Sequence, residues 1–423
     1  MRRFCLFFGL LFHFTWLSGQ GLSQKKLLRK IKTTPQLSNA FVGLYVEKMD
    51  SKNKPTALNG AHYMTPASNT KLLTFLASTQ TFSDLPALEF AIDKQGQAHF
   101  KSTGYPLLFH PFYPDSTLVQ FIEDFPKWIY HPPNTKPKPM GSGWAWDDYK
   151  YYFAAPSSVF PIYGNTTRGV FGASKVKLVP PLPSVKDSTV SNLERYRFIN
   201  KFKYNPQNWK EKDTLYRPFI PNDTLFVKLL ESATKSKISL VKQKDSLVWK
   251  PFYTANETLL YKALLHDSDN GIAEALLLMI ANRQKGIFTP EAAIDSLQKR
   301  WSSWLPDPLE WVDGSGVSRY NMVTPRTLVA VLQKIEQELS WETIQDLFPK
   351  SGVSGTLKAY PELKEVFAKT GTLRHNHNLS GFWVSAKGER YAFSIMVNHF
   401  TKPTAEIRQG ISELLTWLQK KMR

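Results

Sequence analysis

The chain has 423 residues, which indicates about three domains, and 42% of them are hydrophobic and 21% charged. Its 28 Phe, 17 Tyr and 12 Trp argue against a disordered chain, and its single cysteine, Cys5, excludes a disulfide within the chain and a cysteine-based zinc site. Lysine and arginine total 54 against 35 acidic residues, and the resulting charge of +19 indicates a polyanionic partner or an acidic surface.

The first residues have the layout of a secretory leader. Arg2 and Arg3 precede an apolar run at 4–17, and small and polar residues follow it. This run is shorter than the roughly 20 residues that cross a bilayer. We therefore predict a signal peptide at residues 1–21 and a periplasmic or other extracytoplasmic location; an uncleaved anchor is the alternative. An exported protein rarely meets nucleic acid, so we expect no nucleic-acid partner.

Apolar periodicity next predicts a short amphipathic helix at residues 25–32 and a hairpin with strands at 41–49 and 57–64. A buried helix then begins at about residue 72. Ser68 precedes it and is suited to a helix cap or a first helical turn.

From residue 82 to residue 253 prolines and aromatics become frequent and the strand patterns are short. We predict that this stretch is an insertion of one or two largely β domains with one helix within 222–239. Helices return afterwards, and two strand patterns at 379–385 and 390–399 flank a turn. The helices expected after the insertion lie at residues 258–265, 271–281, 290–305, 325–339 and 404–422.

The first of three short motifs is the S-x-x-K sequence from Ser68 to Lys71. Residues i and i+3 share one face of a helix. A serine hydroxyl becomes a good nucleophile when a neighbouring base takes its proton, and a buried lysine near another cation can have its pKa lowered enough to do so. Alone the motif is weak, because a capping serine and a solvated lysine are the simpler interpretation. The same pattern also begins at Ser23, Ser51, Ser174, Ser232, Ser239 and Ser296.

The other two motifs carry complementary groups. Ser268-Asp269-Asn270 lies between two predicted helices, where a hydroxyl can relay a proton and an amide can bind a carbonyl; a helix cap is the alternative. Lys369-Thr370-Gly371-Thr372 lies at the start of the C-terminal strand pair. There Gly371 would let a substrate backbone approach as an added strand, and Lys369 with the threonine hydroxyls would bind a carboxylate. An exposed β-turn is the alternative.

The order S-x-x-K, S-D-N, K-T-G is that of penicillin-binding proteins and class A β-lactamases. The chain therefore resembles the penicillin-recognising D,D-peptidases, and more narrowly the D-alanyl-D-alanine carboxypeptidase/endopeptidase family typified by penicillin-binding protein 4. The long gap between Ser68 and Ser268 is similar to the place where that family carries inserted domains. The resemblance rests on residues 66–74, 143–148, 151–156, 267–274, 313–321, 369–372 and 390–393.

The resemblance implies an α+β fold. Residues 22–81 and 254–423 would form a β-lactamase/transpeptidase-like domain, an antiparallel sheet flanked by helices, and residues 82–253 would form the β-rich insertion between the first two motifs. It also implies a serine D,D-peptidase that cleaves D-alanyl-D-alanine bonds and cross-link peptide bonds of peptidoglycan, without a cofactor.

It further implies roles for five residues. Ser68 would attack the peptide carbonyl and form an acyl-enzyme, with Lys71 as the base. Ser268 would relay the proton towards the leaving amine, Lys369 would keep the local field positive, and Asn270 would hold the acyl-side amide. Which group is the base in each half-reaction stays open.

The substrate ends are assigned in the same way. Backbone N–H groups of Ser68 and Thr372 would form the oxyanion hole, and Thr370 and Thr372 would contact the terminal carboxylate, beside Gly371. Asp147 and Asp148 would bind the amino group of the diamino acid in the stem peptide, although a structural hydrogen-bonding pair is an equal alternative. Arg319 would pair with a substrate carboxylate or with one of these aspartates.

The remaining expectations concern partners and competing functions. His375 and His377 follow the third motif without a third ligand, so no metal site is predicted. The expected partners are peptidoglycan stem peptides, β-lactam antibiotics as covalent inhibitors and, as an open expectation, a membrane surface contacted peripherally. The competing functions are a serine β-lactamase, for which no clear acidic motif activates the deacylating water, and a non-catalytic wall-binding scaffold.

Overall fold

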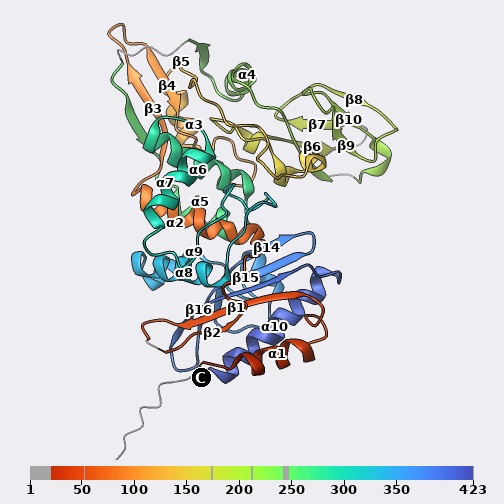
Figure 1. Ribbon diagram of the computed structural model, residues 1–423. Coiled ribbons are helices and arrows are strands. Elements are labelled where there is room, and N and C mark those ends of the chain that lie inside the picture. Colours follow the sequence, from red (N-terminus) through yellow and green to blue (C-terminus); the bar gives the residue numbers. More distant parts are fainter. Residues whose placement is uncertain (1–20, 52, 173–174, 211–212, 242–246, 423) are drawn as a thin grey trace, which may run out of the picture.

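The computed structural model describes residues 21–422 except 52, 173–174, 211–212 and 242–246. The signal peptide predicted at 1–21 therefore lies, but for its last residue, outside the described residues. Figure 1 shows the layers: a sheet between two terminal helices and a group of further helices, with the insertion on the far side of that group. In the part of the chain that is described, no helix is both long enough and apolar enough to cross a bilayer.

A five-stranded antiparallel sheet lies at the centre, in the order β14-β15-β16-β1-β2. Strand β1 pairs with β16 along its whole length, from Phe41 opposite Asn398 onward, so the two ends of the chain share one sheet. The strands are β1 (Phe41–Lys48), β2 (Thr56–Leu58), β14 (Val366–Leu373), β15 (Asn376–Val384) and β16 (Arg390–Asn398). These pairings confirm the α+β class with an antiparallel sheet flanked by helices.

The predicted strand at 57–64 is wrong in length. Strand β2 stops at Leu58, because Asn59 has a φ of 53° and turns the chain out of the extended conformation. Met64 forms an isolated bridge with Val323 instead.

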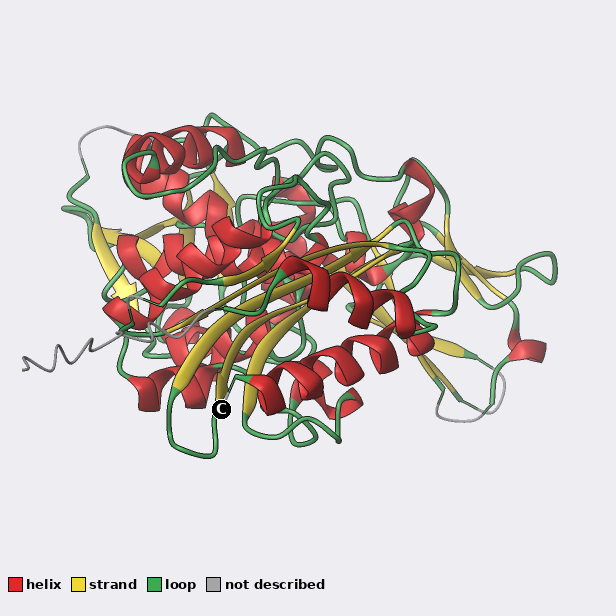
Figure 2. Cartoon of the chain, turned by 60° about the horizontal axis from the view of Figure 1, so that its bottom comes forward, coloured by secondary structure: helices red, strands yellow, loops and turns green. Residues whose placement is uncertain are grey.

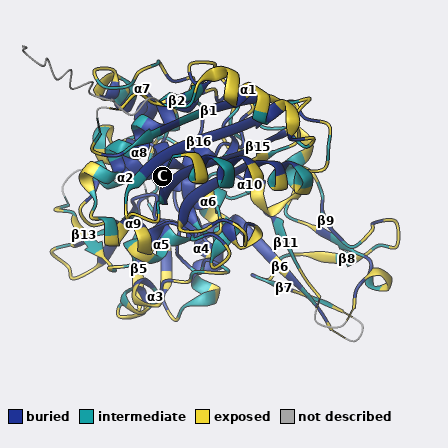
Figure 3. Cartoon of the chain, turned by 90° about the horizontal axis from the view of Figure 1, so that it is seen from below, coloured by how far each residue is buried: buried dark blue, intermediate teal, exposed yellow. Residues whose placement is uncertain are grey.

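The two faces of the sheet follow from alternation along the strands. In β1, Val42, Leu44 and Val46 pack against α1 (Gln24–Thr33) and α10 (Thr404–Lys421) in one apolar cluster. The residues between them, such as Gly43 and Tyr45, face the opposite helices. Figure 3, seen from below, shows buried strands behind the exposed outer faces of α1 and α10.

The other face carries the helices that position the site. Helix α6 is buried at every residue from Ile272 to Ala281, which is expected of a helix surrounded by protein. Figure 2 shows how closely the helices surround the sheet strands. The helices of this layer are α2 (Lys71–Thr81), α5 (Glu257–Leu265), α6 (Asn270–Lys285), α7 (Pro290–Trp301), α8 (Pro325–Glu338) and α9 (Trp341–Leu347). All but α9 lie where periodicity predicts them.

The described residues of the insertion form one five-stranded sheet and two three-stranded sheets. The five-stranded sheet is mixed and has the order β12-β5-β4-β3-β13, and the smaller sheets are β11-β6-β7 and β8-β10-β9. The helix expected within 222–239 is α4, which ends before β12 begins. The short helix α3, capped by the Asp115 side chain, was not predicted from the sequence. The division of the chain at residues 82 and 253 stays a prediction. The elements are β3 (Pro86–Ile92), β4 (Ala98–Ser102), α3 (Ser116–Glu123), β5 (Lys127–Tyr130), β6 (Thr166–Phe171), β7 (Val176–Val179), β8 (Ser184–Lys186), β9 (Leu193–Arg195), β10 (Phe202–Tyr204), β11 (Thr214–Pro218), α4 (Asp223–Ala233), β12 (Lys237–Leu240) and β13 (Lys250–Tyr253).

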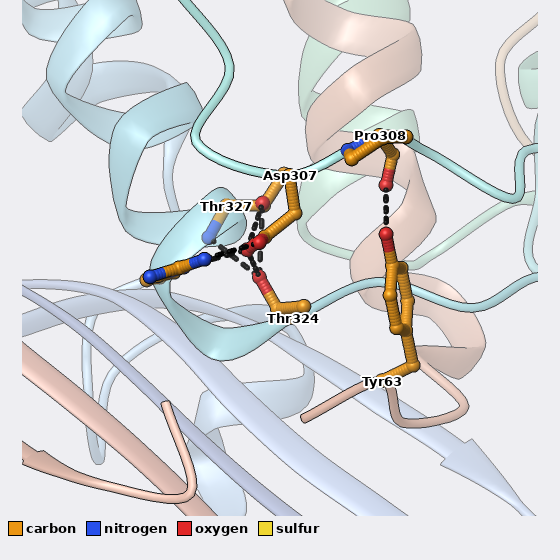
Figure 4. A network of polar contacts seen from close by, with 6 residues as sticks. Tyr63, Asp307, Pro308, Thr324 and Thr327 are labelled. Carbon is orange, nitrogen blue, oxygen red and sulfur yellow. Dashed lines mark hydrogen bonds and ion pairs between the residues drawn. The ribbon is translucent and has the colours of Figure 1, made fainter. Parts of the chain in front are cut away.

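A polar network fixes the loop between α7 and α8 (Figure 4). Asp307 forms an ion pair with Arg326 and accepts a hydrogen bond from Thr324 Oγ1 at 2.6 Å. Tyr63 donates to the carbonyl of Pro308 at 2.9 Å. These contacts anchor the start of the segment 308–323, which continues into the site.

Candidate active site

Ser68 lies in a 3₁₀ turn, η1 (Ala67–Thr70), that runs directly into α2. Lys71, the first residue of α2, directs its Nζ atom back to Ser68 Oγ at 3.0 Å. The same amine contacts Asn270 Oδ1 at 2.6 Å and the carbonyl oxygen of Ser315 at 2.7 Å. The S-x-x-K spacing therefore brings a hydroxyl and an amine into hydrogen-bond contact at a helix start.

The turn is held in place by the segment 313–318. Ala67 has a φ of 49°, and its carbonyl accepts a hydrogen bond from Thr70 Oγ1 at 2.9 Å. Gly316 packs against it so closely that a Cβ atom there would lie 1.9 Å from the Ala67 oxygen. Only glycine allows this approach, and the backbone around Ser68 is fixed as a result.

Burial changes the acid–base properties of Lys71. The side chain is fully buried, and this lowers the pKa of its amine to about 8, although Asp313, Glu274 and Asp269 oppose the shift. About a tenth of the amine is then neutral at pH 7, and about half at pH 8. A neutral amine 3.0 Å from a hydroxyl can accept its proton.

A second hydroxyl–amine pair lies beside the first. Lys369, in the middle of β14, directs Nζ to Ser268 Oγ at 2.9 Å. Burial, and then the charge of Lys71, lower the pKa of Lys369 well below its usual value. Ser268 has a φ of 60°, a conformation unusual for serine and of the kind found at functional sites. The three motifs thus meet at one place, as the sequence predicts.

Asn270 connects this centre to the insertion. Its Oδ1 atom accepts from Lys71, and its Nδ2 atom donates to the carbonyl of Phe153 at 2.7 Å. These two contacts set the direction of the amide. Asp269 caps α6 by accepting from the Ile272 N–H at 2.9 Å, as its alternative interpretation predicts.

Two acidic residues that the sequence analysis gave no role organise the site. Glu274 accepts from the N–H groups of Gly314 and Ser315, at 3.2 and 2.8 Å, and so directs the Ser315 carbonyl towards Lys71. Burial, and then Asp313, raise the pKa of Glu274 to about 7. Asp313 accepts from the Trp144 indole at 2.9 Å and from N–H groups of its own loop. The sequence signals were the D-G-S-G stretch at 313–316 and the buried glutamate within an apolar helix.

Along β14 the remaining motif residues differ in their surroundings. A Cβ atom on Gly371 would lie 2.4 Å from the Pro66 oxygen and 2.5 Å from Asn69 Oδ1, so this glycine lets the strand contact the Ser68 turn. The hydroxyl of Thr370 donates to Thr356 Oγ1 at 2.8 Å. Thr372 is exposed.

Asp147, Asp148 and Arg319 lie in two adjacent segments. The aspartates belong to the short turn η2 (Trp146–Lys150), and the Arg319 backbone N–H donates to the Gly143 carbonyl at 3.2 Å. Burial, and then Asp147, raise the pKa of Asp148, and the charge of Arg319 opposes this. These side chains are exposed or half-buried, as ligands for an incoming molecule must be.

A cavity of about 340 Å³ lies beside the second motif. Ser268 and Asn270 form one wall, and Tyr113, Tyr152 and Phe153 of the insertion form another. An elongated substrate could therefore contact both the helical layer and the insertion.

The two histidines after the third motif have protein partners. His375 Nδ1 lies 2.8 Å from the Phe400 carbonyl, and buried His377 contacts Thr372 and Tyr360. Among the described residues no group of three or more His, Cys, Asp or Glu side chains is arranged to hold a metal ion.

Sequence comparison gives both a family and individual relatives. Residues 256–420 match the D-Ala-D-Ala carboxypeptidase 3 (S13) family. D-alanyl-D-alanine carboxypeptidase DacB of Haemophilus influenzae is 27% identical over 300 residues, 62% of this chain and 62% of that protein, so the match spans less than two thirds of its length. A D-alanyl-D-alanine carboxypeptidase of Actinomadura sp. is 33% identical over 147 residues, 32% of this chain and 27% of that protein.

Structural comparison agrees. The crystal structure of penicillin binding protein 4 from Haemophilus influenzae has a TM-score of 0.70 at 21% identity, covering 93% of this chain and 99% of that one. A predatory peptidoglycan endopeptidase from Bdellovibrio bacteriovorus has a TM-score of 0.52 at 14% identity, covering 90% and 93%. At these identities the likeness establishes the fold.

Proposed function

We propose that this chain is a serine D,D-peptidase. Residues 256–420 match the D-Ala-D-Ala carboxypeptidase 3 (S13) family and the chain has the fold of penicillin-binding protein 4, so the resemblance predicted from the three motifs is confirmed. It cleaves D-alanyl-D-alanine bonds in peptidoglycan stem peptides and, as a D,D-endopeptidase, the peptide cross-links. The observation that carries the proposal is the 3.0 Å contact between Ser68 Oγ and the buried amine of Lys71.

The reaction begins with Ser68. Its oxygen attacks the carbonyl carbon of the penultimate D-alanine while the neutral amine of Lys71 takes the hydroxyl proton. The carbonyl oxygen becomes an oxyanion, which the backbone N–H groups of Ser68 and Thr372 stabilise. When the peptide bond breaks, the leaving amine receives a proton through Ser268, and an ester on Ser68 remains. Water then hydrolyses the ester and restores the hydroxyl.

The two lysines have different electrostatic roles. Lys71 carries the transferred proton, and Lys369, 2.9 Å from Ser268 Oγ, favours delivery of a proton from that hydroxyl and attracts the substrate carboxylate. Burial lowers the pKa of Lys71, and burial and then the charge of Lys71 lower that of Lys369, which keeps a base available at neutral pH.

Substrate recognition is assigned to the residues around this centre. Asn270 holds the acyl-side amide, Thr370 and Thr372 bind the terminal carboxylate, and Gly371 allows close approach of the backbone. Asp147 and Asp148, with Arg319 beside them, bind the amino group of a diamino acid. Asp147 and Arg319 are exposed and Asp148 is half-buried, which supports this assignment.

The proposed substrate sets the location and the partners. Peptidoglycan lies outside the cytoplasmic membrane, so we propose export by the signal peptide at 1–21 to the periplasm or another extracytoplasmic site. β-Lactam antibiotics are expected as covalent inhibitors at Ser68, and the net charge of +19 suits an acidic wall polymer. Peripheral contact with a membrane stays part of this proposal; nucleic acid does not.

Incubation with a stem pentapeptide ending in D-Ala-D-Ala tests the proposal. Wild-type protein should release one D-alanine, and Ser68→Ala should release none above background, as chromatography of the products shows. The matched control is Ser232→Ala, since Ser232 begins another S-x-x-K sequence but its hydroxyl donates to the Leu229 carbonyl. Equal release by wild type and Ser68→Ala would contradict the proposal.

The same preparation separates the competing functions. Rapid turnover of a chromogenic cephalosporin would favour a serine β-lactamase. Binding of cross-linked muropeptides without any cleavage by wild type would favour a wall-binding scaffold. Conversion of muropeptide dimers to monomers would establish the endopeptidase activity.

A further inference from the structure

A buried histidine lies directly behind one proposed substrate contact. Thr372 in β14 and His377 in β15 are cross-strand partners. The Thr372 Oγ1 and His377 Nδ1 atoms are 2.7 Å apart, and His377 Nε2 lies 2.7 Å from the Tyr360 hydroxyl. Thr372 is exposed, whereas His377 is only 2% exposed and Tyr360 is fully buried. Thr372, His377 and Tyr360 thus form a row that runs from the surface into the apolar layer beneath α10.

Burial and hydrogen-bond contacts determine where the protons of His377 and Tyr360 lie. Burial, and then the nearby Arg408, lower the pKa of His377 to about 3, so the ring is neutral and has one N–H. Burial raises the pKa of Tyr360, which keeps its phenol protonated, and the positive charge of Arg408 partly offsets the shift. The Tyr360 side chain is fully buried, and among the described residues His377 Nε2 is the hydrogen-bond partner of its hydroxyl. If Nε2 donated to Tyr360, the buried O–H would be left without this acceptor, so the Tyr360 O–H donates to His377 Nε2.

The remaining proton positions follow. With Nε2 as an acceptor, the single ring proton is on Nδ1, which donates to Thr372 Oγ1. The Thr372 oxygen then accepts the hydrogen bond from His377, and the Thr372 hydroxyl proton is free to point away from the protein. A hydroxyl in this state is a hydrogen-bond donor to an anion, whereas the opposite tautomer would make the hydroxyl donate to the histidine.

We propose that His377 is a positioning residue that holds the Thr372 hydroxyl as a donor to the terminal carboxylate of the substrate, with Tyr360 fixing its tautomer. This inference rests on the proposed function, because it assumes that Thr372 meets that carboxylate. It specifies the ligand chemistry at this end of the site: a free carboxylate, which accepts the Thr372 proton, in preference to a carboxamide, which carries no charge.

The experiment compares two peptides that differ only in this group, one ending in D-Ala-D-Ala with a free carboxylate and one ending in the carboxamide. His377→Leu removes the donor to Thr372. His377→Asn restores an N–H at the Nδ1 position. Tyr360→Phe removes the hydroxyl that fixes the His377 tautomer. His375→Asn is the control, since the His375 ring contacts the Phe400 carbonyl and has no role in the proposed site.

For His377→Leu we expect kcat/KM on the carboxylate peptide to fall about 10- to 100-fold, mainly through KM, because a hydrogen bond to a charged group is weakened. The carboxamide peptide should change less than threefold. His377→Asn should recover most of the loss, Tyr360→Phe should show a smaller loss of the same kind, and His375→Asn should match wild type. The unfolding transition of each variant is recorded alongside.

An equal fall for both peptides, or failure of His377→Asn to recover activity in a folded protein, would show a structural role only and overturn the inference. An unchanged His377→Leu variant would overturn it too while leaving the proposed function intact. If wild type itself releases no D-alanine, the proposed function fails and the inference fails with it.

Discussion

At the scale of single residues, the main finding is that two lysine amines are buried within one polar centre. Lys71 and Lys369 each contact one serine hydroxyl, at 3.0 and 2.9 Å. Bringing a charged ammonium out of water is costly, and a second nearby charge increases the cost. Burial therefore converts residues that are inert acids in water into groups able to exchange protons near neutral pH.

The pH dependence of acylation tests this conversion. Because the pKa of Lys71 is lowered to about 8, the fraction of neutral amine rises with pH and levels off above that value. The rate at which a fluorescent penicillin acylates Ser68 should follow this curve between pH 6 and pH 10. Lys71→Arg keeps a cation that does not deprotonate and should be slower by about 10²- to 10⁴-fold. A flat profile, or full activity in Lys71→Arg, would contradict the role of Lys71 as base.

His377 predicts a separate pH effect on stability. Its folded pKa of about 3 lies below the usual 6.5, so the unfolded chain binds the extra proton between these values and stability falls as pH falls through that window. From pH 7 to pH 4.5 wild type should lose about 2 to 3 kcal/mol more than His377→Asn. Urea titrations of both proteins at the two pH values measure this. Parallel losses would show that His377 is protonated in the folded state.

At the scale of elements, the site depends on how closely β14 lies against η1. The strand reaches the Ser68 turn at Gly371, and the segment 313–318 reaches it from another side at Gly316. Both contacts are between backbones, which cannot move aside as a flexible side chain can. The position of the Ser68 turn against β14 and against the segment 313–318 thus depends on two glycines.

Gly371→Ala should separate the strand from the turn. Its Cβ atom would lie 2.4 Å from the Pro66 oxygen, so β14 must shift. We expect acylation of Ser68 to fall at least tenfold and the free energy of unfolding to fall by about 1 to 3 kcal/mol. Gly172→Ala is the control, because among the described residues the nearest atom to a Cβ placed there, the Lys175 oxygen, is 3.8 Å away. Unchanged acylation in Gly371→Ala would show that the close approach is not needed.

Elements with strong periodicity were predictable and short ones were not. Helices α6 and α8 and strands β15 and β16 have long apolar patterns, and all were expected. Helices α3 and α9 are short and depend on caps by Asp115 and Ser340, a local signal that turns also carry. Strand β2 ends through the backbone conformation of Asn59, which apolar patterning does not report.

Only the motif residues of the site could be predicted from the sequence. The residues Ser68, Lys71, Ser268 and Lys369 are named by spacing and order alone. The contacts of Glu274 with Gly314 and Ser315, and of Asn270 with Phe153, join segments distant in the chain. Such pairings depend on tertiary packing, so one sequence without coordinates does not give them.

At the scale of the whole molecule, the insertion contributes directly to the site. The Trp144 indole donates to Asp313, and Phe153 accepts from Asn270. Asn270 also contacts Lys71, and Asp313 lies two residues before Ser315, whose carbonyl oxygen contacts Lys71. The insertion and the helical layer therefore form one functional unit, even though their sheets are separate (Figure 1).

Trp144→Phe tests this connection, since it keeps the ring and removes the indole N–H. We expect the free energy of unfolding to fall by about 1 kcal/mol or slightly more. The value of kcat/KM for stem peptides, which reach the insertion, should fall more than the rate of acylation by the smaller benzylpenicillin. Equal effects on both reactions would show that the insertion does not contact the substrate.

The most direct test of the account is the site of covalent modification by penicillin. Mass spectrometry of the intact protein after incubation with benzylpenicillin should show one adduct, and peptide mapping should place it on Ser68. The adduct should be absent from Ser68→Ala and present in Ser232→Ala. An adduct that persists in Ser68→Ala, or that maps to Ser268, would contradict the assignment of the nucleophile.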